Sequence, residues 1–177
     1  MPHKKSKAMP TKQNNYAFID SQNLNLGVRA LGWRLDYKKF RLYLKNKYQV
    51  EKAYIFIGLI PGNEELYSSL SDSGYQLVFK PTVQYVEDKQ ITYKGNVDAE
   101  LVLYAAAKTI ANYDKAIIVS GDGDFGCLIE YLLQKNKLQR VICPNNHYSS
   151  LLRKYSAHID ILAKAKRSLV YNPKNKK

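Results

Sequence analysis

Short apolar runs and helical patterns alternate along the chain from residue 16 to residue 165. Runs typical of buried strands occupy residues 16–20, 50–60, 75–80, 115–120 and 138–143. Apolar residues at helical spacing occupy residues 24–31, 37–48, 63–72, 97–111, 124–135, 149–155 and 158–165, and a short hairpin is expected over 83–86 and 90–93. Alternation of this kind predicts an α/β fold with a mostly parallel central sheet that helices cover on both faces.

The length and the apolar segments predict one domain that does not enter a membrane. A chain of 177 residues with 45% hydrophobic residues suits one domain, which we place at residues 16–166. No apolar run reaches the roughly 18 residues that a transmembrane helix needs, and no apolar stretch follows the basic N-terminus as in a secretory signal. Cys127 and Cys143 stand in no CxxC pair, so we expect two ordinary thiols and a cytoplasmic protein.

The net charge of +13 is concentrated at the two ends of the chain. Residues 1–15 hold four Lys and no acid, and residues 164–177 hold six Lys or Arg and no acid, which leaves 18 basic against 15 acidic residues between them. We therefore expect basic flexible tails at residues 1–15 and 167–177. They either only solubilise the protein or hold phosphate backbones without sequence preference.

Four aspartates stand where the predicted strands and helices meet. Asp20 ends the first strand, Asp122 and Asp124 follow the strand at 115–120, and Asp98 opens the Ala-rich helix. In a parallel sheet, ligands bind beyond the carboxyl ends of the strands, so the fold can bring all four acids to one edge. The alternatives are structural, since Asp98 could cap its helix and Asp122 and Asp124 could serve a turn.

Electrostatics favours a metal ion at such an edge. Two like charges about 4 Å apart repel by about 4 kcal/mol at an effective dielectric of 20. A group of four carboxylates therefore needs a cation or partial protonation. Oxygen ligands without Cys or His favour Mg²⁺ or Mn²⁺, and such an ion can activate water and stabilise the leaving oxygen of a phosphodiester.

Two motifs in the segment 121–126 are misleading. The sequence GDGDFG matches GxGxxG after a strand, but two carboxylates would face the pyrophosphate and no acid follows the next strand to bind the ribose. The segment also contains the DFG triplet of protein kinases. The chain has neither the HRD nor the VAIK motif, however, and it is too short for a kinase.

Three segments, FIDSQN, KGNVDAEL and VSGDGDFGCLIEYL, resemble in order and spacing the NYN family, also called LabA-like, of PIN-like nucleases. The resemblance covers residues 16–165. It implies a PIN-like Rossmannoid three-layer sandwich and metal-dependent cleavage of RNA. It also implies that Asp20, Asp98, Asp122 and Asp124 are the catalytic and metal-binding acids, and that Asn23 and Ser120 match polar positions beside them.

The chain departs from the family pattern in the Ala-rich helix. Many members carry a further Asp about two helical turns after position 98, where this chain has Leu103 and Tyr104. Glu100 lies about 200° around the helix from Asp98, so it cannot take that place. Asn96 also stands inside what is usually a KG-V-D run.

We therefore predict a metal-dependent endoribonuclease that hydrolyses single-stranded RNA with Mg²⁺ or Mn²⁺. Asn23, Ser120 and Lys94 are the expected substrate-binding or orienting residues, and basic residues of the rim and tails bind the RNA. Whether the chain forms a homo-oligomer is left open. The missing helix acid keeps an alternative, an RNA-binding or adaptor protein with little or no cleavage. A phosphatase remains a third candidate, although Gln22 stands where a haloacid-dehalogenase-like enzyme needs the second Asp of DxD.

Overall fold

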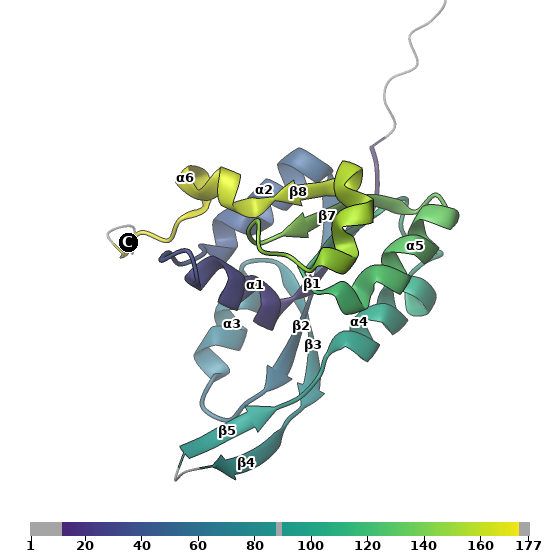
Figure 1. Ribbon diagram of the computed structural model, residues 1–177. Coiled ribbons are helices and arrows are strands. Elements are labelled where there is room, and N and C mark those ends of the chain that lie inside the picture. Colours follow the sequence, from purple (N-terminus) through teal and green to yellow (C-terminus); the bar gives the residue numbers. More distant parts are fainter. Residues whose placement is uncertain (1–11, 88–89, 174–177) are drawn as a thin grey trace, which may run out of the picture.

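The computed structural model describes residues 12–87 and 90–173, and its centre is a six-stranded parallel sheet (Figure 1). The strand order is β3-β2-β1-β6-β7-β8. The strands are β1 (Asn15–Asp20), β2 (Val50–Leu59), β3 (Tyr75–Pro81), β6 (Ala116–Val119), β7 (Leu138–Cys143) and β8 (Ile159–Ile161). The predicted α/β fold class with a parallel sheet is confirmed.

Helices cover both faces of this sheet and make three layers. They are α1 (Ser21–Arg29), α2 (Tyr37–Tyr48), α3 (Glu64–Asp72), α4 (Asp98–Leu103), α5 (Gly126–Gln134) and α6 (Lys166–Leu169). The other helical segments are the π-helix η1 (Tyr104–Lys108) and the 3-10 helices η2 (Gly123–Phe125), η3 (Ser150–His158) and η4 (Leu162–Ala165).

Alternate residues of the strands pack into two separate hydrophobic cores, one on each face of the sheet. Tyr16 and Phe18 of β1 pack with α4 and α5 on one face, whereas Ala17 and Ile19 pack with α1, α2 and α3 on the other. This period of two is the reason that β1, although buried throughout, can support a helix layer on each side.

The strand order reverses between β1 and β6. From β1 the chain winds outward through β2 and β3, and it returns to place β6 on the other side of β1, followed by β7 and β8. Both neighbours of β1 run parallel to it, with Ile19 opposite Ile55 and Val119. Such a reversal leaves a crevice at the carboxyl ends of the two central strands, where ligands bind in open α/β sheets.

One predicted helix is wrong. The spacing of apolar residues predicts a helix over 158–165, but Ile159–Ile161 form the edge strand β8, which pairs with β7 before η4 begins. A segment of three residues carries too few positions to show a period of two, so only its pairing with Val141 and Cys143 reveals the strand.

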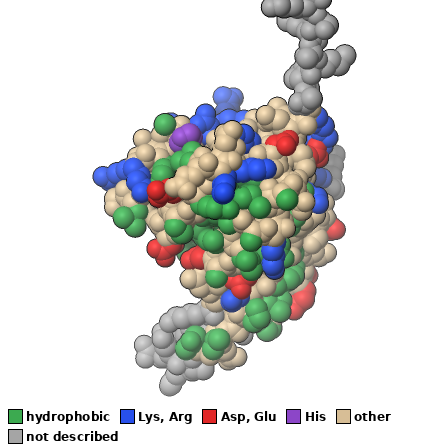
Figure 2. Space-filling model, turned by 90° about the vertical axis from the view of Figure 1, so that its right-hand side faces the viewer, with side chains coloured by type: hydrophobic (Ala, Val, Ile, Leu, Met, Phe, Trp, Pro, Cys, Tyr) green, Lys and Arg blue, Asp and Glu red, His purple; other side chains and the backbone are tan. Residues whose placement is uncertain are grey.

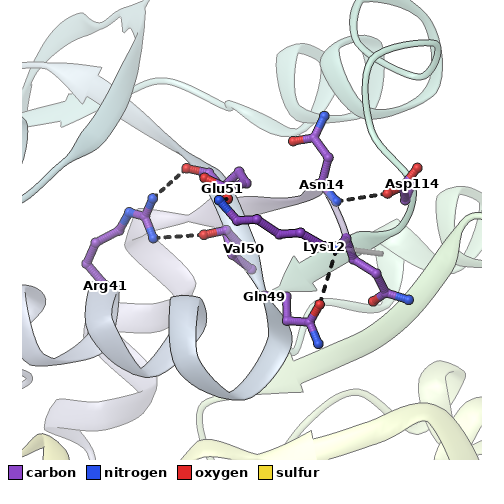
Figure 3. Close-up of polar contacts among 8 residues, drawn as sticks. Lys12, Asn14, Arg41, Gln49, Val50, Glu51 and Asp114 are labelled. Carbon is purple, nitrogen blue, oxygen red and sulfur yellow. Dashed lines mark hydrogen bonds and ion pairs between the residues drawn. The ribbon is translucent and has the colours of Figure 1, made fainter. Parts of the chain in front are cut away.

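Parts of both expected tails are packed onto the domain. At the N-terminus, Lys12 pairs with Glu51, and the backbone N–H of Asn14 donates to Asp114 Oδ2 at 2.8 Å (Figure 3). Asn15 is fully buried and its amide donates to the Tyr48 carbonyl oxygen at 2.8 Å. Residues 1–11 lie outside the described part of the chain.

The C-terminal boundary also differs from the expected one at residue 166. Leu169 is 1% exposed in the core beneath α2, and an isolated bridge joins Leu35 to Val170. The apolar pair Leu169 and Val170 holds this segment, because the burial of its side chains outweighs the basic residues on either side. Residues 174–177 lie outside the described part.

Two further features bear on function. A separate hairpin, β4 (Val83–Glu87) and β5 (Gln90–Lys94), projects from the body in the region between β3 and α4 (Figure 1). On the face shown in Figure 2, Lys and Arg gather toward the upper part, and acidic and apolar side chains interrupt them below.

No helix of the described residues is long and apolar enough to cross a membrane.

Candidate active site

Asp20 stands at the point where β1 becomes α1. Its carboxylate caps the helix, because Oδ1 accepts a hydrogen bond of 3.1 Å from the backbone N–H of Asn23. The other oxygen, Oδ2, accepts one of 3.2 Å from the Ser120 hydroxyl. Asp20 is 5% exposed and is therefore held rigidly at the base of the site.

The turn after β6 is fixed by the same neighbours. Asn23 Oδ1 accepts a hydrogen bond from the backbone N–H of Gly121 at 2.8 Å, and Ser120 Oγ accepts one from that of Asp122 at 3.1 Å. Asp122 in turn caps η2 by accepting from the backbone N–H of Asp124 at 3.0 Å. Ser120, 1% exposed, thus ties the end of β1 to the turn that carries the next two acids.

Asp98 is supplied by the third element, α4. Its backbone N–H donates to Asn96 Oδ1 at 2.8 Å, so the side chain of Asn96 closes the turn that leads into the helix. The residue that interrupts the expected KG-V-D run therefore has a structural part in placing Asp98. Only its irregular position in the motif marked it in the sequence.

The structure brings three of the four predicted acids together. Carboxylate oxygens of Asp98, Asp122 and Asp124 lie within 4.8 Å of one another. Asp20 lies beside this group, joined to it through Ser120, but outside the set of mutually close oxygens. Asp98 and Asp122 are partly buried and Asp124 is exposed, so the group opens to solvent on one side.

Burial and mutual repulsion both act on these carboxyls. Burial raises the pKa of Asp20, and the charges of Asp98 and Asp122 raise it further, against the hydrogen bonds from Asn23 and Ser120 that lower it. Burial also raises the pKa of Asp98; the hydrogen bond with Asn96 lowers it, and the charges of Asp122 and Asp124 raise it. A cation bound among these groups would offset both the lost hydration and the repulsion.

The donor set fits a hard divalent cation. Asp98, Asp122 and Asp124 offer oxygen atoms alone, and these come from separate carboxylates that face one another. Oxygen-only sites suit Mg²⁺ and Mn²⁺, whereas Zn²⁺ in proteins is bound mainly through His or Cys.

A groove of about 1120 Å³ leads away from the acids. Asp20, Asp98 and Asp122 line one part of it. The rest runs between α1 and α3 and is lined by both polar and apolar side chains, among them Gln22, Asn25, Leu26, Arg29, Arg34, Leu66, Ser69 and Tyr171. The acids are thus open to a ligand larger than a water molecule or an inorganic ion.

The family model of the NYN domain matches residues 16–162, which include all four acids and, apart from Asn15 at the start of β1, all six strands of the sheet. The chain is a member of the NYN family. The resemblance of the three sequence motifs is thereby confirmed.

One curated protein and one solved structure are similar to this chain. The low amplitude and bright protein LabA of Synechococcus elongatus is 27% identical over 143 residues, which cover 77% of this chain and 76% of that protein. A protein of unknown function from Vibrio parahaemolyticus has a crystal structure that superposes with a TM-score of 0.73 at 22% identity, covering 93% of this chain and all of that one. The second likeness concerns the fold alone.

The remaining residues of interest in this NYN domain lie around the group of acids. Glu100 pairs with Lys80 at 2.5 Å, in keeping with its expected position away from Asp98. Tyr104 packs against Tyr54 and Phe56, so no acid replaces the one that many members carry there. The backbone of Lys94 pairs with Val83, and its side chain lies outside what the structure describes.

Proposed function

We propose that this NYN domain is a metal-dependent endoribonuclease that hydrolyses phosphodiester bonds of single-stranded RNA. The observation that carries the proposal is the group formed by Asp98, Asp122 and Asp124 at the reversal of strand order, beside a groove. Membership of a nuclease superfamily supports the same chemistry. Mg²⁺ or Mn²⁺ is the proposed cofactor.

Each residue of the site has a defined part in this proposal. Asp98, Asp122 and Asp124 would hold the cation, with Asp20 completing the negative base of the site. When bound, a divalent cation supplies charge stabilisation for the phosphodiester and lowers the pKa of water. The hydrogen bonds of Ser120 and Asn23 hold the acids in fixed positions, so the site needs little reorganisation during the reaction.

The proposal also covers the lysines that contact the RNA and the cellular location of the protein. Lys94 is proposed to contact the substrate phosphate, and the terminal lysines to hold the RNA backbone loosely. The two cysteines are free, Cys127 exposed and Cys143 buried, which suits the proposed cytoplasmic location.

A second candidate is a protein of the same fold that binds RNA but cuts it slowly or not at all. It is favoured by the apolar packing of Tyr104 and by Leu103, where many members carry a further acid. Fewer carboxylates at the site would weaken its hold on the cation.

A substrate panel with thermal melting decides between these functions. Labelled single-stranded RNA, single-stranded DNA and p-nitrophenyl phosphate are each incubated with Mg²⁺, Mn²⁺ or EDTA, and the parent is compared with Asp98→Asn and Asp124→Asn. We expect cation-dependent cleavage of RNA by the parent and none by the variants. Saturating Mn²⁺ should also raise the melting temperature of the parent alone, since binding stabilises by mass action.

Glu65→Gln is the matched control, because it removes one exposed acid from α3, outside the group. It should keep both cleavage and the Mn²⁺-dependent shift. A parent that shifts with Mn²⁺ and binds RNA without cutting it would support the second candidate. A parent without any shift would contradict the metal site, and hydrolysis of p-nitrophenyl phosphate alone would indicate a phosphatase.

A further inference from the structure

We infer that the groove is a track for a single RNA strand and that Arg29, Arg34 and Tyr171 form a second anchoring subsite at its end away from the acids. The inference rests on the proposed function and names how its substrate is held. Asp20 and Arg29 flank the two ends of α1, and a helix of nine residues rises about 12 Å from its first residue to its last. That distance corresponds to about three stacked nucleotides at 3.4 Å each.

The two arginines are available to a phosphate. Both are exposed and line the groove, and within the described part of the chain neither forms an ion pair with an acid. The Arg34 guanidinium lies 5.2 Å from the centre of the Tyr171 ring, an arrangement that orients its planar donors. Guanidinium groups bind phosphate oxygens through paired hydrogen bonds, which suits a strand held by its backbone.

The subsite is built from segments far apart in the sequence, and backbone hydrogen bonds hold them together. Tyr171 N–H donates to the Arg34 carbonyl oxygen at 2.8 Å, and Asp36 N–H donates to that of Leu169 at 2.9 Å. The bridge between Leu35 and Val170 lies between these two bonds. Arg34 and Tyr171 are therefore placed before a ligand arrives, so that little entropy is lost on binding.

The groove favours an unpaired strand over a duplex or a mononucleotide. Its volume of about 1120 Å³ exceeds the roughly 300–1,000 Å³ of pockets that enclose small ligands. Leu26 from α1 and Leu66 from α3 line it and are 57% and 42% exposed. Apolar side chains contact the faces of bases, which a single strand offers and a duplex keeps within its stack.

The test measures RNA binding in EDTA, so that cleavage does not enter. Fluorescently labelled RNAs of eight and of two nucleotides are titrated with the parent and with Arg29→Ala/Arg34→Ala. We expect the double variant to bind the octanucleotide at least tenfold more weakly. The slope of log K against log salt should decrease by about 0.7 for each phosphate that the variant no longer neutralises. The dinucleotide carries a single phosphate, so the two substitutions should weaken its binding less than that of the octanucleotide.

The matched control is Lys45→Ala/Lys135→Ala, which removes two exposed positive charges that do not line the groove. It should bind the octanucleotide within about twofold of the parent, since distant exposed charges are screened by salt. Tyr171→Ala should also weaken binding, because the ring no longer orients the Arg34 guanidinium, whereas Tyr171→Phe keeps the ring and should retain it. Melting temperatures of all variants confirm that they fold.

Three results would overturn the inference: equal weakening in the arginine variant and its control, equal affinity for a duplex of the same length, or no binding of the octanucleotide by the parent. A protein that binds as expected but does not cut would leave the inference intact and contradict the nuclease activity. If the parent cuts RNA and the arginine variant keeps full affinity, the nuclease activity is supported and the inference about the arginines is contradicted.

Discussion

Asp20 combines a structural and a chemical part in one side chain. One oxygen caps α1 and the other accepts from Ser120, yet the carboxylate is almost wholly buried beside two further acids. Capping stabilises the fold, whereas burial of an ionised carboxylate opposes it. The two contributions can be separated, because asparagine caps a helix as well as aspartate does and carries no charge.

Asp20→Asn should therefore be at least as stable as the parent in EDTA at neutral pH. Burial raises the pKa of Asp20, so the folded state disfavours its ionised form, and asparagine removes that cost. Each kcal/mol gained raises the melting temperature by about 2–4 °C in a protein of this size. Asp20→Ala should be less stable than Asp20→Asn by about 1 kcal/mol, the usual worth of an N-cap. Urea denaturation of the three proteins measures this difference, and equal stability of the two variants would mean that the cap contributes nothing.

At the scale of elements, the site depends on how closely the turn after β6 approaches the start of η3. A Cβ on Gly123 would lie 2.4 Å from Ser149 Oγ and 2.9 Å from Leu151 Cδ1. Ser149 itself is held, because its N–H donates to the Gly121 carbonyl oxygen at 2.9 Å. Gly123 thus permits the turn after β6 to approach Ser149 closely, and this approach fixes the positions of Asp122 and Asp124.

Gly123→Ala should destabilise the protein by about 1–3 kcal/mol, the range found when well-packed sites are overfilled. It should also reduce the Mn²⁺-dependent rise in melting temperature, since the two flanking acids must move. Gly126→Ala is the control: a Cβ there meets nothing within 4 Å, and the residue is the first of α5. Alanine in a helix is favoured over glycine by about 0.5–1 kcal/mol. If both variants are destabilised equally in urea, the approach to Ser149 is not the cause.

The elements themselves were largely predictable, and the exception has a physical reason. β1 and β6 are continuous apolar runs followed at once by Asp20 or by a glycine-rich turn, so the strand ends and the acids after them could be read together. Local sequence also predicted α2, and in the structure Asp36 is its N-cap. β8 could not be predicted, because it becomes a strand only by pairing with β7.

At the scale of the whole molecule, the chain ends belong partly to the domain. Deletion of residues 169–177 should lower the free energy of unfolding by about 1.5–3 kcal/mol, the value of burying one leucine. Leu169 supplies that burial beneath α2. Deletion of residues 174–177 alone should leave the midpoint of urea unfolding unchanged. A deletion of 169–177 without effect on that midpoint would show that the segment contributes no stability.

The terminal lysines should act on RNA and not on stability. Residues 1–11 and 174–177 hold six lysines. Their removal should weaken binding of a long single-stranded RNA and lower its salt slope by about 0.7 for each phosphate that they neutralise. Cleavage at saturating RNA should be kept, because the acids and the groove stay in place. If affinity and salt slope are unchanged, these lysines serve solubility alone.

The proximity of Asp98, Asp122 and Asp124 was predictable from the sequence, but the extent of the groove was not. The acids follow strands, and the sheet rule brings strand ends together. No comparable rule joins Arg34 to Tyr171, whose contact depends on how the last packed segment crosses the molecule. The position of Asp20 just outside the closest set of carboxylates likewise depends on side-chain geometry that no motif records.

The position of β1 between β2 and β6 also bears on the synthesis of the chain. Asp20 leaves the ribosome about 100 residues before Asp122 and Asp124, and its partner Ser120 comes equally late. At about 5–20 residues per second, the acids are separated by about 5–20 s of translation. A growing chain therefore contains no complete set of acids until β6 and the turn after it have been made. The acids of the site thus come together only when most of the chain has been made.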